Sequence, residues 1–213
     1  MRNGKLINLY DIDNEFDKAI SIIRGMYYVG GIFIYPTDTV YNIGANPLNL
    51  LAIDRLKKMF STNIFSEATL LVGSILNLSN YIEIISEKHF EFLNSIWPNP
   101  INVIFRLNSQ FQSLFGINQA SFKIPNNRFC LKLLSEINGP ILSLRLNNNH
   151  NTSKGYEIFK EEYSEKVDAI FYTHKESFND DSGLIDLTDY KPLIIKENKF
   201  KLKNFIDEYR YVS

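Results

Sequence analysis

The sequence predicts a single α/β domain with a mixed β-sheet, and three observations lead to this fold class. Short apolar runs with strand character alternate with segments of helical periodicity along nearly the whole chain. No Pro/Ser-rich linker, internal repeat or low-complexity block separates them. The chain has 213 residues, of which 45% are hydrophobic and 22% charged, and this balance is typical of a globular protein that buries a full core.

The first half of the chain predicts three helices and two buried strands. Residues 13–28 place apolar side chains at near-helical spacing, and acidic residues at their start suit the helix dipole. Gly30 and Gly31 end this helix, and IFIYP follows as a short strand that closes at Pro36. Further helices are expected over residues 48–59 and 86–96, the latter ended by WPNP, with a buried strand at ATLLVGS between them.

The second half predicts six strands and two helices. The strands are expected at INVIFRL, SFKIP, PILSLRLN, DAIFYT, SGLIDLT and PLIIKEN. The helices are expected over 127–138, stopped by Gly139 and Pro140, and over 156–167. Residues 199–213 are expected to form a short terminal helix or tail, so that one domain spans 1–213 with its core at about 13–198.

Charge and residue usage exclude several classes of protein. The net charge of -1 gives no global attraction to polyanions, so a nucleic-acid contact would need a local basic patch. The single cysteine, Cys130, excludes an internal disulfide, and the three histidines are too widely spaced to predict a metal site. No apolar run approaches the ~18 residues of a membrane span, and no signal-like segment opens the chain. A cytoplasmic protein without membrane association is expected.

A cluster of hydroxyl groups follows the first predicted strand, in GGIFIYPTDTVYNIGAN. Thr37, Asp38, Thr39 and Tyr41 come directly after the strand, and ligands of open α/β sheets bind at the carboxyl ends of strands. Hydroxyls and backbone N–H groups there can hold carboxylate, phosphate or amino-acid groups. Alternatively, Thr and Asp close the turn and cap the next helix. On the residues alone, the turn is the favoured interpretation.

Common nucleotide-binding and hydrolase motifs are absent from the sequence. It contains no GxxxxGK[ST], no GxGxxG and no GxSxG. The residues taken alone therefore lead only to an α/β domain with a polar site at a strand end.

The order of several segments resembles the YrdC/YciO family of threonylcarbamoyl-AMP synthases. GGIFIYPTDTVYNIGAN resembles the family's PTDTVYGLG signature, IWPNPINVIF its WPGPLT segment, and SFKIPNN its V-R-I-P-D segment. GPILSLRLN resembles the P-x-x-S-T-S-A-N strand, while SGLIDLT and PLIIKEN resemble the closing S-T-V-I-D and I-x-R-x-G strands. The resemblance spans about residues 13–198.

This resemblance implies a fold and a reaction. The fold is an open, twisted, mixed sheet flanked by helices around a large central cavity. The reaction converts L-threonine, bicarbonate and ATP into L-threonylcarbamoyl-adenylate and pyrophosphate, and partner proteins use the adenylate to modify tRNA. Mg²⁺ accompanies ATP as a substrate complex. No tightly bound cofactor and no resident metal are expected.

The resemblance also assigns the expected site residues by position. Catalytic roles fall on Thr37, Thr39 and Lys123, and contacts to threonine and carbamate on Thr37, Thr39, Tyr41 and Ser182. Contacts to the nucleotide fall on Ser143, Arg145, Asn147 and Lys196. Lys123 and Lys196 stand where the family has Arg, which keeps the charge but loses the bidentate fork. The alternative for both lysines is a solvated surface amine.

Several positions depart from the family pattern. Phe60 and Thr62 occupy the places of the basic K-x-R, so either Lys57 or Lys58 reaches the site or these lysines are solvated on the helix face. Arg145 replaces a small Ser, and either supplies a displaced cation or fills the pocket.

Glycine positions also change. Asn42 and Asn99 replace Gly and are expected to keep the positive φ of a turn, and Gly183 replaces Thr.

Three functions are compatible with this pattern. The first is a threonylcarbamoyl-AMP synthase. The alternative is a catalytically degenerate member that binds double-stranded RNA or nucleotide without turnover. A third is a relative that uses the same cavity for a different carbamoyl-type transfer.

Overall fold

The structure, a computed structural model, describes residues 5–8, 13–60, 63–83, 86–146, 155–173, 182–189 and 191–211. Its strands are β1 (Lys5–Asn8), β2 (Ile32–Pro36), β3 (Tyr41–Ala45), β4 (Thr69–Leu71), β5 (Ile101–Arg106), β6 (Gln119–Lys123), β7 (Ile141–Arg145), β8 (Ala169–Tyr172), β9 (Gly183–Asp186) and β10 (Leu193–Lys196). Its helices are α1 (Asp13–Tyr28), α2 (Leu50–Phe60), α3 (Ile64–Glu67), α4 (Ile75–Leu78), α5 (Glu87–Ile96), α6 (Ser109–Phe115), α7 (Arg128–Ile137), α8 (Gly155–Tyr163) and α9 (Leu202–Tyr211).

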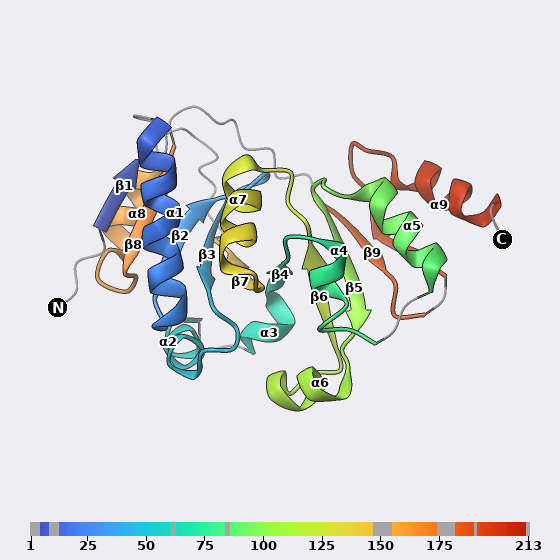
Figure 1. Ribbon diagram of the computed structural model, residues 1–213, viewed down its shortest axis with the longest axis horizontal. Coiled ribbons are helices and arrows are strands. Elements are labelled where there is room, and N and C mark those ends of the chain that lie inside the picture. Colours follow the sequence, from blue (N-terminus) through green and yellow to red (C-terminus); the bar gives the residue numbers. More distant parts are fainter. Residues whose placement is uncertain are drawn as a thin grey trace.

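All these strands form one mixed ten-stranded sheet, in the order β1-β8-β2-β3-β7-β4-β6-β5-β9-β10. The pairs β1–β8, β2–β8, β4–β6 and β5–β9 are parallel, and the other neighbouring pairs are antiparallel. The sheet runs along the long axis of the molecule, with β1 near one end and β9 near the other (Figure 1). The mixed α/β fold expected from the sequence is confirmed.

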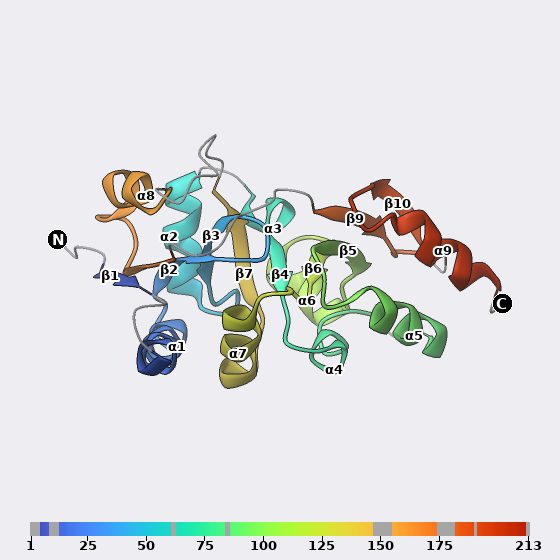
Figure 2. The same ribbon diagram turned by 90° about the horizontal axis from the view of Figure 1, so that it is seen from above.

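Helices cover both faces of the sheet. In Figure 2, α1 and α7 lie on one side of the sheet, and α2 and α8 lie on the other. Side chains of β2 contribute to the cores on both faces, because successive side chains of a strand point to opposite faces of the sheet. Phe33 and Tyr35 belong to the core beneath α1 and α7, whereas Ile32 and Ile34 belong to the larger core on the other side.

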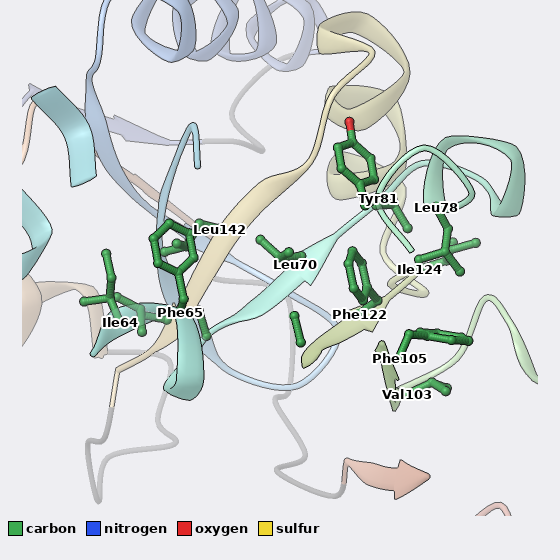
Figure 3. Close-up of a cluster of buried hydrophobic side chains, with 14 of the residues drawn as sticks. Ile64, Phe65, Leu70, Leu78, Tyr81, Val103, Phe105, Phe122, Ile124 and Leu142 are labelled. Carbon is green, nitrogen blue, oxygen red and sulfur yellow. The ribbon is translucent and has the colours of Figure 1, made fainter. Parts of the chain in front are cut away.

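The larger core continues across the middle of the sheet. Figure 3 shows Leu70, Phe122 and Phe105 on the adjacent strands β4, β6 and β5. Phe65 of α3 stacks on Phe115 of α6, with ring centroids 4.3 Å apart. Short helices therefore fill this part of the core. Within the described residues, no helix is both long and apolar enough to cross a membrane.

Most predicted elements appear, and the differences have local causes. Helix α1 and strand β2 have the predicted bounds, and Gly30 adopts a φ of 80° just after α1. The sequence missed β1, α3, α4, α6 and, above all, β3, which was expected to be a turn. Asn42 and Gly44 have low strand propensity, but β3 is paired on both sides, with β2 and β7. Tertiary pairing overrides local preference here.

The expectation for the two asparagines that replace Gly is wrong. Asn42 lies inside β3, and among the described residues only Asn138 and Lys201 are non-glycine residues with positive φ. Asn99 donates a side-chain hydrogen bond from Nδ2 to the backbone oxygen of Ile96 at 2.8 Å. Neither asparagine therefore preserves a glycine-like turn, and each adds a side chain with a contact of its own.

Candidate functional site

A cavity of about 190 Å³ brings together residues from distant parts of the chain. Six of the predicted site residues line it: Thr39, Lys123, Ser143, Arg145, Ser182 and Lys196. They lie on the β2–β3 turn, at the end of β6, on β7, just before β9 and on β10. The predicted clustering of these residues is therefore found, while their roles toward a substrate stay predictions.

The register of the central strands explains part of this clustering. Ser143 of β7 lies opposite Gly44 of β3 on one side and Thr69 of β4 on the other. Arg145, two residues further along β7, lies opposite Asn42. Residues opposite one another on neighbouring strands share a face of the sheet, as do residues two apart on one strand. The fold thus places polar side chains from three strands on the same face.

Gly44 leaves room for a polar chain of contacts beside the cavity. A Cβ at this position would lie 2.6 Å from Cε1 of Tyr35 and 2.9 Å from Cε2 of Phe33, so only glycine fits. The Tyr35 hydroxyl reaches Ser143 Oγ at 2.7 Å, and Asn42 Nδ2 donates to the same Oγ at 2.7 Å. Burial raises the pKa of Tyr35 well above its ordinary value, so its hydroxyl stays protonated. Ser143 is therefore held by two buried partners.

The PTDTV segment forms a hydrogen-bonded turn between β2 and β3. Thr37 Oγ1 donates to the backbone oxygen of Val40 at 2.7 Å and accepts from the backbone N–H of Thr39 at 3.2 Å. These contacts are those of a turn-closing threonine. Thr37 does not line the cavity, whereas Thr39 does.

Tyr41 also lies outside the cavity lining. Its hydroxyl accepts a hydrogen bond from the backbone N–H of Thr173 at 3.0 Å and donates to the oxygen of the same residue at 3.4 Å. It thereby joins the start of β3 to the residue after β8. Its predicted role toward threonine stays a prediction, and this contact gives it a structural one.

Lys123 forms a buried ion pair with Asp38. Nζ lies 2.7 Å from Asp38 Oδ1, and the two side chains are only 5% and 4% exposed. Asp38 Oδ2 also accepts a hydrogen bond from the backbone N–H of Asn126 at 3.0 Å. The interpretation of Lys123 as a solvated surface amine is therefore wrong. Lys196 is exposed and lines the same cavity.

The positions of the family's basic K-x-R do not supply cations here. Phe60 packs against the larger core, and Thr62 lies outside the described residues. Lys58 forms an exposed ion pair with Asp54 at 2.6 Å, one helical turn away, and neither Lys57 nor Lys58 lines the cavity. The cations that do line it are Lys123, Arg145 and Lys196. Both interpretations of Arg145, as a displaced cation and as a residue that fills the pocket, stay predictions, and Asn147 lies outside the described residues.

Sequence reasoning missed four polar residues of the cavity: Asn42, Glu67, Thr69 and Asn102. Asn42 was interpreted as part of a turn. Asn102 lies in the segment that resembles WPGPLT but was given no role there, and Glu67 and Thr69 lie in segments without a motif. Alternation along the strands was the signal that could have found Asn42, Thr69 and Asn102, because each lies on a strand.

The cavity contains one carboxylate among its lining residues, that of Glu67. Over the part of the chain that the structure describes, no group of three or more His, Cys, Asp or Glu side chains is placed to hold a metal ion.

Comparisons with known proteins agree with this fold. The model of the Sua5/YciO/YrdC family, which carries the description telomere recombination, matches residues 26–198. The threonylcarbamoyl-AMP synthase of Pyrococcus abyssi is 21% identical over 202 residues, which cover 93% of this chain and 58% of that protein. The chain therefore spans less than two thirds of the length of this relative.

Two solved structures share the fold. The crystal structure of Escherichia coli YciO matches with a TM-score of 0.77 and 23% identity, over 96% of this chain and all of that one. The crystal structure of P. abyssi Sua5 complexed with L-threonine matches with a TM-score of 0.74 and 19% identity, over 96% of this chain and 60% of that one. At these identities, the likeness shows the fold.

Proposed function

The chain belongs to the Sua5/YciO/YrdC family, and from this premise we propose that it is an L-threonylcarbamoyladenylate synthase. The proposed reaction joins L-threonine, bicarbonate and ATP into threonylcarbamoyl-AMP and releases pyrophosphate. Partner proteins then use the adenylate to modify tRNA. A relative that is named threonylcarbamoyl-AMP synthase and aligns with 93% of this chain supports the proposal.

One observation carries the proposal: three cations and four hydroxyls gather in one cavity. Lys123, Arg145 and Lys196 supply positive charge, and the hydroxyl groups belong to Thr39, Thr69, Ser143 and Ser182. The substrates carry a carboxylate, a bicarbonate and a triphosphate, so their negative charges need compensation before they can approach one another. A cavity with this lining suits that set of ligands.

The proposed chemistry has two steps. The threonine amine attacks the carbon of bicarbonate, a C–N bond forms, and water leaves to give a carbamate. A carbamate oxygen then attacks the α-phosphorus of ATP, and pyrophosphate leaves with the electrons of the broken P–O bond. Mg²⁺ arrives with ATP and offsets phosphate charge as part of that substrate. Positioning and charge neutralisation supply most of the rate in such transfers.

Individual residues have distinct parts in this proposal. The Arg145 guanidinium can donate two parallel hydrogen bonds to a phosphate or carboxylate, whereas Lys196 acts as a point charge. The charge of Lys123 is balanced by Asp38 at 2.7 Å, so Lys123 orients its ligand by hydrogen bonding more than by net charge. In this proposal Arg145 provides the bidentate contact to the charged ligand.

The proposal is tested by product formation with purified protein. Adenylate, identified by mass spectrometry, and pyrophosphate are expected when L-threonine, bicarbonate and ATP are all present. Omission of any one substrate should abolish the adenylate. Pyrophosphate release without threonine would indicate simple ATP hydrolysis. If no adenylate forms at high enzyme concentration, the proposed activity is wrong.

The alternative function is binding of nucleotide or double-stranded RNA without turnover. Phe60 favours it, because an apolar side chain packs against the core where the family has a cation. ATP binding by calorimetry without adenylate formation supports the nucleotide form of this alternative. For RNA, binding should weaken steeply as salt rises, since counterion release drives such contacts.

A further inference from the structure

Two asparagines that line the cavity each have a carboxamide oxygen without a hydrogen-bond donor among the described residues. Oδ1 of Asn42 and Oδ1 of Asn102 are buried and have no donor among the described residues, and both asparagines line the cavity. Asn42 as a whole is only 8% exposed. Buried polar atoms in folded proteins are nearly always hydrogen-bonded, so these two acceptors indicate donors on a ligand.

The orientation of Asn42 is fixed by its other terminal atom. Nδ2 donates to Ser143 Oγ at 2.7 Å, and Ser143 in turn bonds to the Tyr35 hydroxyl at 2.7 Å. Tyr35 and Ser143 are at most 2% exposed. Because this buried chain holds Nδ2, Oδ1 is the terminal atom of Asn42 that is left without a partner among the described residues.

The chemistry of the cavity indicates which ligand group would supply the donor. Phosphate, carboxylate and bicarbonate oxygens would pair with the cations of the cavity, Lys123, Arg145 and Lys196, and the triphosphate group offers no N–H. An amino acid offers N–H donors on its α-amino group. A carboxylate facing that group would favour its ammonium form, whereas a neutral carboxamide accepts an N–H without holding the extra proton. The nitrogen lone pair then stays available for attack on carbon.

We propose that Asn42 is a specificity-determining residue that accepts a hydrogen bond from the amino group of the amino-acid substrate. This inference rests on the proposed function and deepens it. Asn102 provides a second acceptor in the same cavity. The PTDTVYGLG signature, which this segment resembles, has Gly at the position of Asn42. The signature therefore does not provide this contact. The same contact persists after the first step, since the carbamate keeps one N–H.

The test compares two ligands that differ only by the amino group. Calorimetry measures the affinity for L-threonine and for (R)-3-hydroxybutanoate, in which hydrogen replaces the amine. Asn42→Leu removes the acceptor at similar size and is expected to weaken threonine binding about tenfold, while binding of the hydroxy acid stays unchanged. An equal loss of affinity for both ligands, or no loss of affinity for threonine, would overturn the inference. The absence of threonine binding to the wild-type protein would overturn it too.

Further variants separate a ligand contact from a structural effect. Asn42→Gly should also weaken the binding of threonine and leave the binding of the hydroxy acid unchanged, even if Asn42→Leu folds poorly. Asn127 is a matched control, since it is equally buried at 7% exposure but caps α7 through the Cys130 N–H and does not line the cavity. Asn127→Ala should lower the melting temperature without changing the ratio of the two affinities. A changed ratio in this control would contradict the assignment.

Turnover distinguishes this inference from the proposed function. In a competent enzyme, Asn42→Leu should raise KM for threonine about tenfold and leave KM for ATP unchanged. Adenylate formation with an unaltered KM for threonine overturns only the role of Asn42. Selective threonine binding that depends on Asn42, without any adenylate, overturns only the proposed synthase activity.

Discussion

Lys123 Nζ and Asp38 Oδ1 lie 2.7 Å apart in a buried ion pair between residues 85 positions apart in sequence. The pair joins the β2–β3 turn to the end of β6, and Asp38 also accepts the backbone N–H of Asn126. Both side chains are almost fully removed from water. Loss of one partner would leave the other charged, buried and uncompensated.

The first prediction concerns this pair. Asp38→Asn should lower the free energy of unfolding by about 3–5 kcal/mol, because Lys123 would be left as an unpaired buried charge. The double variant Asp38→Asn with Lys123→Met should recover a large part of this loss. Chemical denaturation gives both values. Asp54→Ala is the control, since its exposed pair with Lys58 contributes at most about 1 kcal/mol. A similar decrease in the free energy of unfolding for Asp38→Asn and Asp54→Ala would refute the prediction.

The second prediction concerns the cations of the cavity. Arg145→Ala should raise KM for ATP about tenfold or more, because hydrogen bonds between charged groups are lost. Steady-state kinetics of pyrophosphate release provides the measurement. Lys58→Ala should leave the kinetics unchanged, since Lys58 pairs with Asp54 away from the cavity. A reversed outcome, with Lys58 required and Arg145 dispensable, would show that a lysine of α2 and not Arg145 replaces the missing K-x-R cations.

The third prediction concerns stability at alkaline pH. Burial raises the pKa of Tyr35 above its unfolded value of 10.0, so the folded state keeps a proton that the unfolded state loses. Stability is therefore fully present below about pH 10 and falls as pH rises further, by up to about 1.4 kcal/mol per pH unit. Urea denaturation between pH 8 and pH 11 measures this slope. Tyr35→Phe should make it shallower, and an unchanged slope would count against the assignment.

The fourth prediction concerns Gly183, which stands where the family pattern has Thr. A Cβ here would lie 2.7 Å from Leu202 Cδ1 and 3.0 Å from Asn198 Nδ2. Gly183→Ala should therefore destabilise the protein by about 1–3 kcal/mol through overpacking. Gly25→Ala is the matched control: it lies in α1 with no atom within 4 Å of its Cβ position, and should stabilise by about 0.5–1 kcal/mol. Thermal unfolding compares the two, and a stabilising Gly183→Ala would show that the contact relaxes freely.

Local patterns in the sequence determined most of the secondary structure and the family. Helical spacing gave α1 its bounds, and an apolar run ended by proline gave β2 its bounds. Ordered motifs pointed to six residues that the fold does bring into one cavity. These predictions succeeded because spacing, turn residues and motif order are properties of neighbouring residues, which a sequence displays directly.

Tertiary structure alone decided what the polar side chains contact. Only the pairing of β3 with β2 and β7 makes a strand of YNIGA and directs Asn42 toward Ser143. Only the sheet order brings Asp38 to Lys123, and joins the Tyr41 hydroxyl to the backbone of Thr173. Strand order and register join residues far apart in the chain, and a shift of one residue would turn each side chain to the other face. Local spacing carries no record of that register, so the residues could be named from the sequence while their partners could not.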